Sequence, residues 1–179
     1  RTNFDLSRHS KYSGEDLSYF DEEKKKKYIP YVIEPSAGAD RSVLAFMIDA
    51  YKEEKDKGDE IRTILKIHPQ LASYKVAVFP LLANKPELVK LARKIYDDLR
   101  TQFMTDFDDR GNIGKRYYSQ DEIGTPWCVT VDFDSLEDKK VTVRERDSMK
   151  QKRLPIKELT EYFRKQLYAK GGSASGGEN

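Results

Sequence analysis

The sequence predicts an α/β protein with a central mixed β-sheet flanked by helices. Three observations support this fold class. A continuous apolar run at 75–82 is typical of a strand that is buried on both faces. Apolar residues at helical spacing follow at 86–101, and alternating apolar residues at 127–133 and 139–145 predict two further strands.

Few regular patterns occur in the first 60 residues. Residues 1–27 are polar and end in a charge run, Asp21–Lys27, which predicts a solvated turn. The aromatic and β-branched run 28–33 predicts a strand. Residues 42–51 are apolar nearly all round, which predicts a buried helix, and the charged residues 52–60 predict an exposed loop.

A second unit is expected to begin near Ile64. Asn84 can cap the helix predicted at 86–101, and Pro86 is tolerated in the first turn of that helix. Residues 103–107 predict a further strand, and a short helix is expected before 127–133.

The remaining elements follow the alternating strands. Residues 134–138 predict the turn between them, and Trp127 at the start of the first is expected to lie in the core. Apolar residues at helical spacing predict a last helix at 156–168. The glycine- and serine-rich residues 171–179 predict a flexible tail.

Composition limits the classes of protein to which the chain can belong. Charged residues make up 36% and hydrophobic residues 37% of 179 residues, and no run approaches the about 18 apolar residues that a membrane-spanning helix needs. We therefore expect no membrane partner. The single cysteine, Cys128, excludes an intrachain disulfide and favours a reducing compartment, so we expect a cytoplasmic location.

The distribution of charged residues along the sequence allows two interpretations. Basic residues exceed acidic ones in 139–170, as expected of a polyanion binder and equally of a solvated lysine-rich surface.

The chain starts at Arg1 without a leader-like pattern, so we expect no signal peptide and expect a piece of something longer.

Common catalytic motifs do not occur in the sequence. There is no P-loop, no dinucleotide-binding glycine motif and no nucleophile elbow. His9 and His68 are far apart, and one cysteine cannot complete a structural zinc site. We therefore expect no metal bound by this chain.

The segment 34–41, Glu-Pro-Ser-Ala-Gly-Ala-Asp-Arg, combines several reactive groups. The guanidinium of Arg41, at the start of a predicted helix, suits a phosphate group. Glu34 and Ser36 share one side of a strand end, where they could hold an ammonium group. The residues alone equally allow Glu34 and Arg41 to pair with each other, with Gly38 serving only as a turn.

A second candidate site lies at 115–122, where two cations stand beside two tyrosines. Such a group can stack and hydrogen-bond unstacked RNA bases, although each tyrosine could equally be a half-buried core contact. The candidates for contacts to RNA bases are Lys115, Arg116, Tyr117, Gln120, Asp121 and Glu122.

Residues 32–46 resemble motif 3 of the class II aminoacyl-tRNA synthetases, in particular of the dimeric glycyl-tRNA synthetases. Residues 1–6 are similar to the segment that follows motif 2 in that family. Further segments look like its anticodon-binding domain: 75–81, 111–116, 121–126 and 141–147. The resemblance covers nearly the whole chain except the tail.

The resemblance implies three parts in the chain. Residues 1–63 would be the C-terminal part of the class II antiparallel-sheet catalytic domain, with motif 3 at 31–50. Residues 64–170 would be the anticodon-binding domain, and 171–179 a tail.

The resemblance also implies a function, ATP-dependent attachment of glycine to its tRNA through glycyl-adenylate. Arg41 would be the catalytic residue that contacts the ATP phosphates, and Mg²⁺ is expected with the ATP. The glycine-binding residues would be Glu34, Pro35, Ser36, Ala37 and Gly38. The ATP-binding residues would be Gly38, Ala39, Asp40 and Arg41.

Two motifs of the family are missing from these 179 residues. Motif 1 builds the homodimer expected of the longer enzyme, and motif 2 supplies an arginine that holds the α-phosphate. We therefore expect no aminoacylation by this chain alone. The alternative is a non-catalytic nucleic-acid-binding accessory subunit on the same fold, such as a mitochondrial DNA polymerase accessory protein. A third option is an isolated α/β interaction module.

Overall fold

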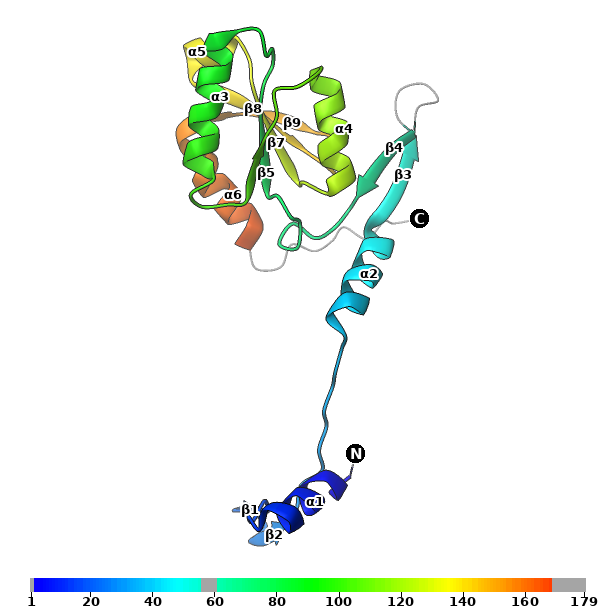
Figure 1. Cartoon of the computed structure of the whole chain (residues 1–179). Helices are drawn as coiled ribbons and strands as arrows, with labels where there is room; N and C mark the ends of the chain where they lie inside the picture. The colour runs from blue at the N-terminus through cyan, green and yellow to red at the C-terminus, as the bar shows by residue number, and fades with distance from the viewer. Residues whose placement is uncertain (1, 56–60, 169–179) are drawn as a thin grey trace. The chain divides into compact units, whose positions relative to one another are not determined.

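The computed structural model describes residues 2–55 and 61–168 (Figure 1). The chain divides into two compact units, one up to Val43 and one from Leu44 onward. The expected boundary after residue 63, which separates a catalytic from an anticodon-binding part, stays a prediction.

Among its described residues, the first unit contains a helix, a small hairpin and the first turn of a second helix, 39–43. Helix α1 (Phe4–Ser13) ends at Gly14, whose left-handed φ of 77° directs its N–H to the carbonyl of Ser10. Strand β1 (Tyr19–Asp21) pairs antiparallel with β2 (Lys26–Tyr28). The turn predicted for the charge run is confirmed for the exposed residues 22–25, whereas Asp21, Lys26 and Lys27 belong to the strands. The strand predicted at 28–33 is wrong beyond Tyr28, since Pro30 has no N–H to give to a ladder.

Helix α2 (Ala39–Ala50) confirms the predicted helix but corrects its environment. Only Ala50 is buried, and the large apolar side chains are 48–68% exposed. The prediction of a buried helix is wrong for this chain because these side chains find no cover among the described residues. The exposed residues are Val43, Leu44, Phe46, Met47 and Ile48.

A second hairpin follows α2 without an intervening residue. Strand β3 (Tyr51–Lys55) pairs antiparallel with β4 (Ile61–Leu65). The loop predicted at 52–60 is therefore wrong for 52–55, where the charged residues pair with the more apolar β4. Residues 56–60 lie outside the described residues.

A five-stranded mixed sheet forms the centre of the second unit, in the order β6-β5-β7-β8-β9. Strand β5 pairs in parallel with β6 and β7, whereas β7–β8 and β8–β9 are antiparallel. This sheet and its flanking helices confirm the predicted fold class. The strands are β5 (Val76–Pro80), β6 (Thr105–Phe107), β7 (Trp127–Val131), β8 (Lys140–Glu145) and β9 (Gln151–Pro155).

Helices cover both faces of this sheet (Figure 1). One face packs against α3 (Pro86–Leu99) and α6 (Leu159–Tyr168), which follows the short 3₁₀ helix η1 (Ile156–Glu158). The other face packs against α4 (Ile113–Ile123), over a small apolar cluster that includes Phe79 and Cys128. Residues 134–138 form a short helix, α5 (Asp134–Asp138), rather than the predicted turn, and Asp132 accepts a hydrogen bond from the Ser135 N–H there.

Helix α3 confirms the predicted amphipathic pattern. Its buried residues recur at helical spacing and face the sheet. The predicted cap is wrong, since the N-cap residue is Lys85 and Pro86 takes the first helical position. The buried residues are Leu88, Ala92, Ile95 and Leu99.

Aromatic side chains fill the main core between the sheet and α6. Phe163 is fully buried and contacts Trp127 and Phe103, with ring centroids 5.6 and 6.3 Å away. Trp127 is only 5% exposed, which confirms its predicted place in the core. None of the helices in residues 2–55 and 61–168 has the length and hydrophobicity needed to cross a bilayer.

Candidate nucleic-acid interface

The segment 34–41 lies on the surface at the start of α2. All eight side chains are exposed, and the residues before Ala39 have no regular secondary structure. The N–H and the hydroxyl of Ser42 both donate to the carbonyl of Gly38, at 3.0 and 2.9 Å. The sequence therefore places Arg41 in the first turn of a helix, where the backbone dipole favours an anion.

The chain's own packing does not require a glycine at position 38. A Cβ added there would meet only the side chain of Arg41, at an ordinary 3.9 Å. Although both residues are described, no ion pair joins Glu34 to Arg41. Both charges are thus open to solvent, as a ligand-binding segment requires.

The six candidates on α4 differ in exposure. Asn112 caps the helix, since its side-chain oxygen accepts a hydrogen bond from the N–H of Lys115 at 2.8 Å. Lys115 and Glu122 are exposed, and Tyr117 is half-buried. The three buried candidates are Arg116, Gln120 and Asp121.

Arg116 holds the start of α4 against the end of β5. Its guanidinium donates to the carbonyls of Pro80 at 2.6 Å and Gly111 at 3.2 Å, and lies 5.8 Å from the ring centroid of Phe79. Burial lowers the pKa of Arg116, against the opposing effect of the Asp108 carboxylate. In this structure Arg116 therefore contacts the protein interior.

Tyr117 contacts the sheet beneath α4. Its ring packs edge-to-face on Phe79 with centroids 5.7 Å apart, and its hydroxyl lies 2.5 Å from that of Thr130. Burial raises the pKa of Tyr117. The structure thus shows Tyr117 as a half-buried core contact, and Tyr118 is half-buried as well.

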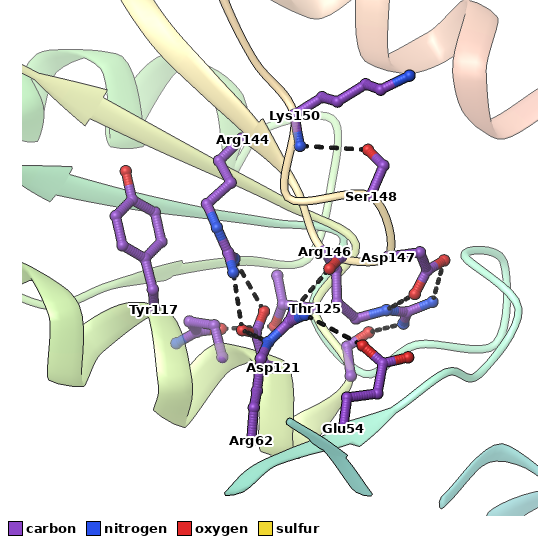
Figure 2. A network of polar contacts seen from close by, with 12 residues as sticks. Glu54, Arg62, Tyr117, Asp121, Thr125, Arg144, Arg146, Asp147, Ser148 and Lys150 are labelled. Carbon is purple, nitrogen blue, oxygen red and sulfur yellow. Dashed lines mark hydrogen bonds and ion pairs between the residues drawn. The ribbon is translucent and has the colours of Figure 1, made fainter. Parts of the chain in front are cut away.

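Asp121 is the centre of a buried polar network (Figure 2). Its two carboxylate oxygens accept hydrogen bonds from Arg144 at 2.9 and 3.0 Å, and Arg62 Nε donates to one of them at 2.8 Å. Burial opposes the charge of Arg144, but its hydrogen bonds to Asp121 outweigh this and raise its pKa. Beside Asp121, Gln120 donates to Asp106 at 2.6 Å.

The sheet face covered in part by α4 is polar along β8 and β9. Strand register places Thr142 beside Arg153 and Arg144 beside Gln151. Arg153 pairs with Asp132 at 2.6 Å and with Asp138 at 3.0 Å. Sequence reasoning missed Arg62 and the two strand arginines, although alternation with Val141 and Val143 already placed Arg144 on the face opposite the main core.

Residues 75–166, more than half of the chain, match the family model described as anticodon binding domain. The chain belongs to this family. The matched residues contain the whole mixed sheet, helices α3 and α4, and α6 up to residue 166.

Curated relatives named glycine–tRNA ligase are similar to about nine-tenths of this anticodon-binding chain. The protein from Lachnospira eligens is 55% identical over 163 residues, and that from Clostridium beijerinckii is 52% identical over 167 residues. That from Geobacillus kaustophilus is 54% identical over 167 residues. The matches cover 91–93% of this chain but only 35–36% of the relatives, so the chain spans about a third of their length. The resemblance to glycyl-tRNA synthetases is thereby confirmed.

Proposed function

We propose that a longer protein carrying this chain is a glycine–tRNA ligase, which forms glycyl-adenylate from glycine and ATP and passes glycine to its tRNA. The observation that carries this proposal is the 52–55% identity to proteins of that name across nine-tenths of the chain. The accessory-subunit alternative is not favoured, because the same relatives are named as ligases and Glu34, Ser36 and Arg41 stand together in this chain.

In this proposal the segment 34–41 contributes to the catalytic site. Arg41 would hold the ATP phosphates, because its planar, permanent charge lies at the positive end of a helix. Glu34 would bind the ammonium group of glycine with Ser36 beside it. The backbone from Gly38 to Arg41 would run along the nucleotide, a role supported by the absence of any packing need for glycine at 38. Pro35 and Ala37 would complete the glycine pocket, and Ala39 and Asp40 the nucleotide segment.

These roles are positional and electrostatic. Attack of the glycine carboxylate on the α-phosphate needs the two groups held in line and the developing charge stabilised. Among the described residues no group of three His, Cys, Asp or Glu side chains is arranged for a metal ion. Mg²⁺ is expected to accompany the ATP phosphates, and the longer enzyme is expected to be a homodimer.

The anticodon-binding domain would contact the tRNA. Of the α4 candidates, the exposed Lys115 and Glu122 can reach RNA directly. The three buried candidates would fix α4 on the sheet, and Tyr117 would support the outer surface of α4. The buried candidates are Arg116, Gln120 and Asp121.

Binding of glycine tRNA by the 179-residue chain tests the domain's part in this function. Cognate tRNA should bind more tightly than the same tRNA with a changed anticodon, and affinity should fall as salt rises because phosphate contacts release counterions. For the longer protein, glycine-dependent ATP–pyrophosphate exchange is the test. No exchange with glycine in a folded longer protein would refute the ligase proposal.

Ser36 offers a test of the amino-acid pocket in the longer protein. Ser36→Gly is expected to slow glycine-dependent ATP–pyrophosphate exchange about two- to tenfold, the worth of one hydrogen bond. It should also let alanine compete slightly better, since a wall that rejects larger side chains loses a group.

Ser36→Ala is the matched control, because it removes the hydroxyl and keeps the Cβ. It should slow glycine activation to a similar extent without admitting alanine. If neither substitution changes the exchange rate with either amino acid, Ser36 does not line the pocket.

A further inference from the structure

The β3–β4 hairpin is held against α4 by only a few inward-facing residues. Arg62 and Ile64 of β4 are 1% and 0% exposed. At the end of α4, a Cβ on Gly124 would lie 2.9 Å from the carbonyl oxygen of Leu65, so the hairpin and the helix end approach as closely as a glycine allows. Among the described residues the two strands pair only with each other, and an isolated two-stranded hairpin is marginally stable in water. Its position therefore depends on the contact with α4.

Arg62 makes the polar part of this contact (Figure 2). Its Nε donates to Asp121 at 2.8 Å, and its Nη2 donates to the carbonyl of Arg146 at 2.5 Å. Because Asp121 also binds Arg144 of β8, one carboxylate joins the hairpin to the central sheet. The remaining nitrogen, Nη1, has no hydrogen bond among the described residues and lies 3.6 Å from Glu54 of β3.

Burial alone does not explain an arginine at position 62. A buried ion pair commonly adds no more stability than apolar side chains of the same volume. What the guanidinium adds is direction, since its fork fits a carboxylate and a carbonyl in one geometry only. The contact thus fixes the angle at which the hairpin leaves the domain.

The hairpin is also the covalent connection to α2. That helix ends at Ala50 and β3 begins at Tyr51, while the N–H of Lys66 donates to the carbonyl of Ala50 at 2.7 Å. Any change in the angle of the hairpin is therefore passed to the end of the helix whose first turn holds Arg41.

We propose that Arg62 is a positioning residue that, through Asp121, locks the β3–β4 hairpin to the anticodon-binding domain and so keeps RNA bound there in register with α2. The inference rests on the proposed ligase function. It assigns Arg62 no contact with RNA, glycine or ATP.

Hydrogen exchange on the 179-residue chain tests the lock itself. Arg62→Gln should speed amide exchange in β3 and β4 by at least about tenfold, while β5 and β7 keep their protection, because only a local opening is made easier. Arg153→Gln is the matched control, since its carboxylate partners are Asp132 and Asp138, and it removes an ion-paired arginine from the central sheet without breaking the link through Asp121. Unchanged exchange in the hairpin of Arg62→Gln, or equal acceleration in both variants, would overturn the proposal.

Kinetics of the longer protein test the positioning role. Arg62→Gln should lower kcat/KM for glycine tRNA about tenfold, with glycine-dependent ATP–pyrophosphate exchange and charging of an acceptor-stem RNA that lacks the anticodon unchanged. A purely structural role would lower all three rates together and would overturn the proposal. If the unsubstituted longer protein shows no glycine-dependent exchange, the ligase function fails, and the hydrogen-exchange result still decides whether Arg62 locks the hairpin.

Discussion

Replacing Arg41 by alanine in the longer protein is expected to slow glycine-dependent ATP–pyrophosphate exchange by about 10²–10³-fold, the usual effect of removing one preorganised donor from a developing charge. The physical reason is the exposed guanidinium at the first turn of α2, which the proposed function places against the ATP phosphates. Binding of tRNA should remain nearly intact, because Arg41 lies outside residues 75–166, which match the anticodon binding domain.

Arg41→Lys provides the matched comparison for this experiment. Lysine keeps the positive charge but lacks the planar fork, so an intermediate rate is expected. Circular dichroism should show that both variants are folded. Equal loss of exchange and of tRNA binding in a folded Arg41→Ala protein would argue against a phosphate-binding role.

Phe163→Ala is expected to lower the free energy of unfolding of this chain by about 3–5 kcal/mol, as large aromatic truncations in a core do. Phe163 is fully buried, and Trp127, Phe103 and Tyr162 all pack against its ring. Its truncation therefore leaves a cavity in the core. Urea denaturation followed by tryptophan fluorescence measures the loss as a lower midpoint.

Tyr168→Ala is the control for the core prediction, since it lies on the same helix and is 67% exposed. Its unfolding free energy should stay within about 0.5 kcal/mol of the unsubstituted chain. A loss below about 1 kcal/mol for Phe163→Ala would mean that the site collapses around the missing ring, and that this cluster does not govern stability.

Most of the second unit could be predicted because its elements follow simple periods. A continuous apolar run indicates the buried strand at 76–80, and apolar residues at helical spacing indicate the amphipathic helix at 86–99. Strand β9 was missed because four of its five residues are Gln, Lys, Arg and Pro, and pairing with β8 rather than its own pattern makes it a strand. Strand β3 was missed for the same reason.

The candidate sites show a different limit. The types of residue at 115–122 indicated an RNA-binding surface, but a sequence does not say which side of a helix faces a sheet when both sides are polar. Asp121 turned out to be buried because two arginines from distant strands neutralise it, and only tertiary structure brings those groups together. For 34–41 the sequence indicated the helix that begins at Ala39, but the strand end expected to hold Glu34 and Ser36 is wrong, since residues 34–38 have no regular secondary structure.

The buried Cys128 can report how often the centre of the domain opens. It is the only cysteine in the sequence, lies in β7 at the middle of the sheet, and burial raises the pKa of its thiol. A thiol-reactive dye can therefore label the molecule only when the sheet opens, since the reagent needs an accessible thiolate. The ratio of the labelling rate to the rate for a free thiol therefore measures how often the centre of the domain opens.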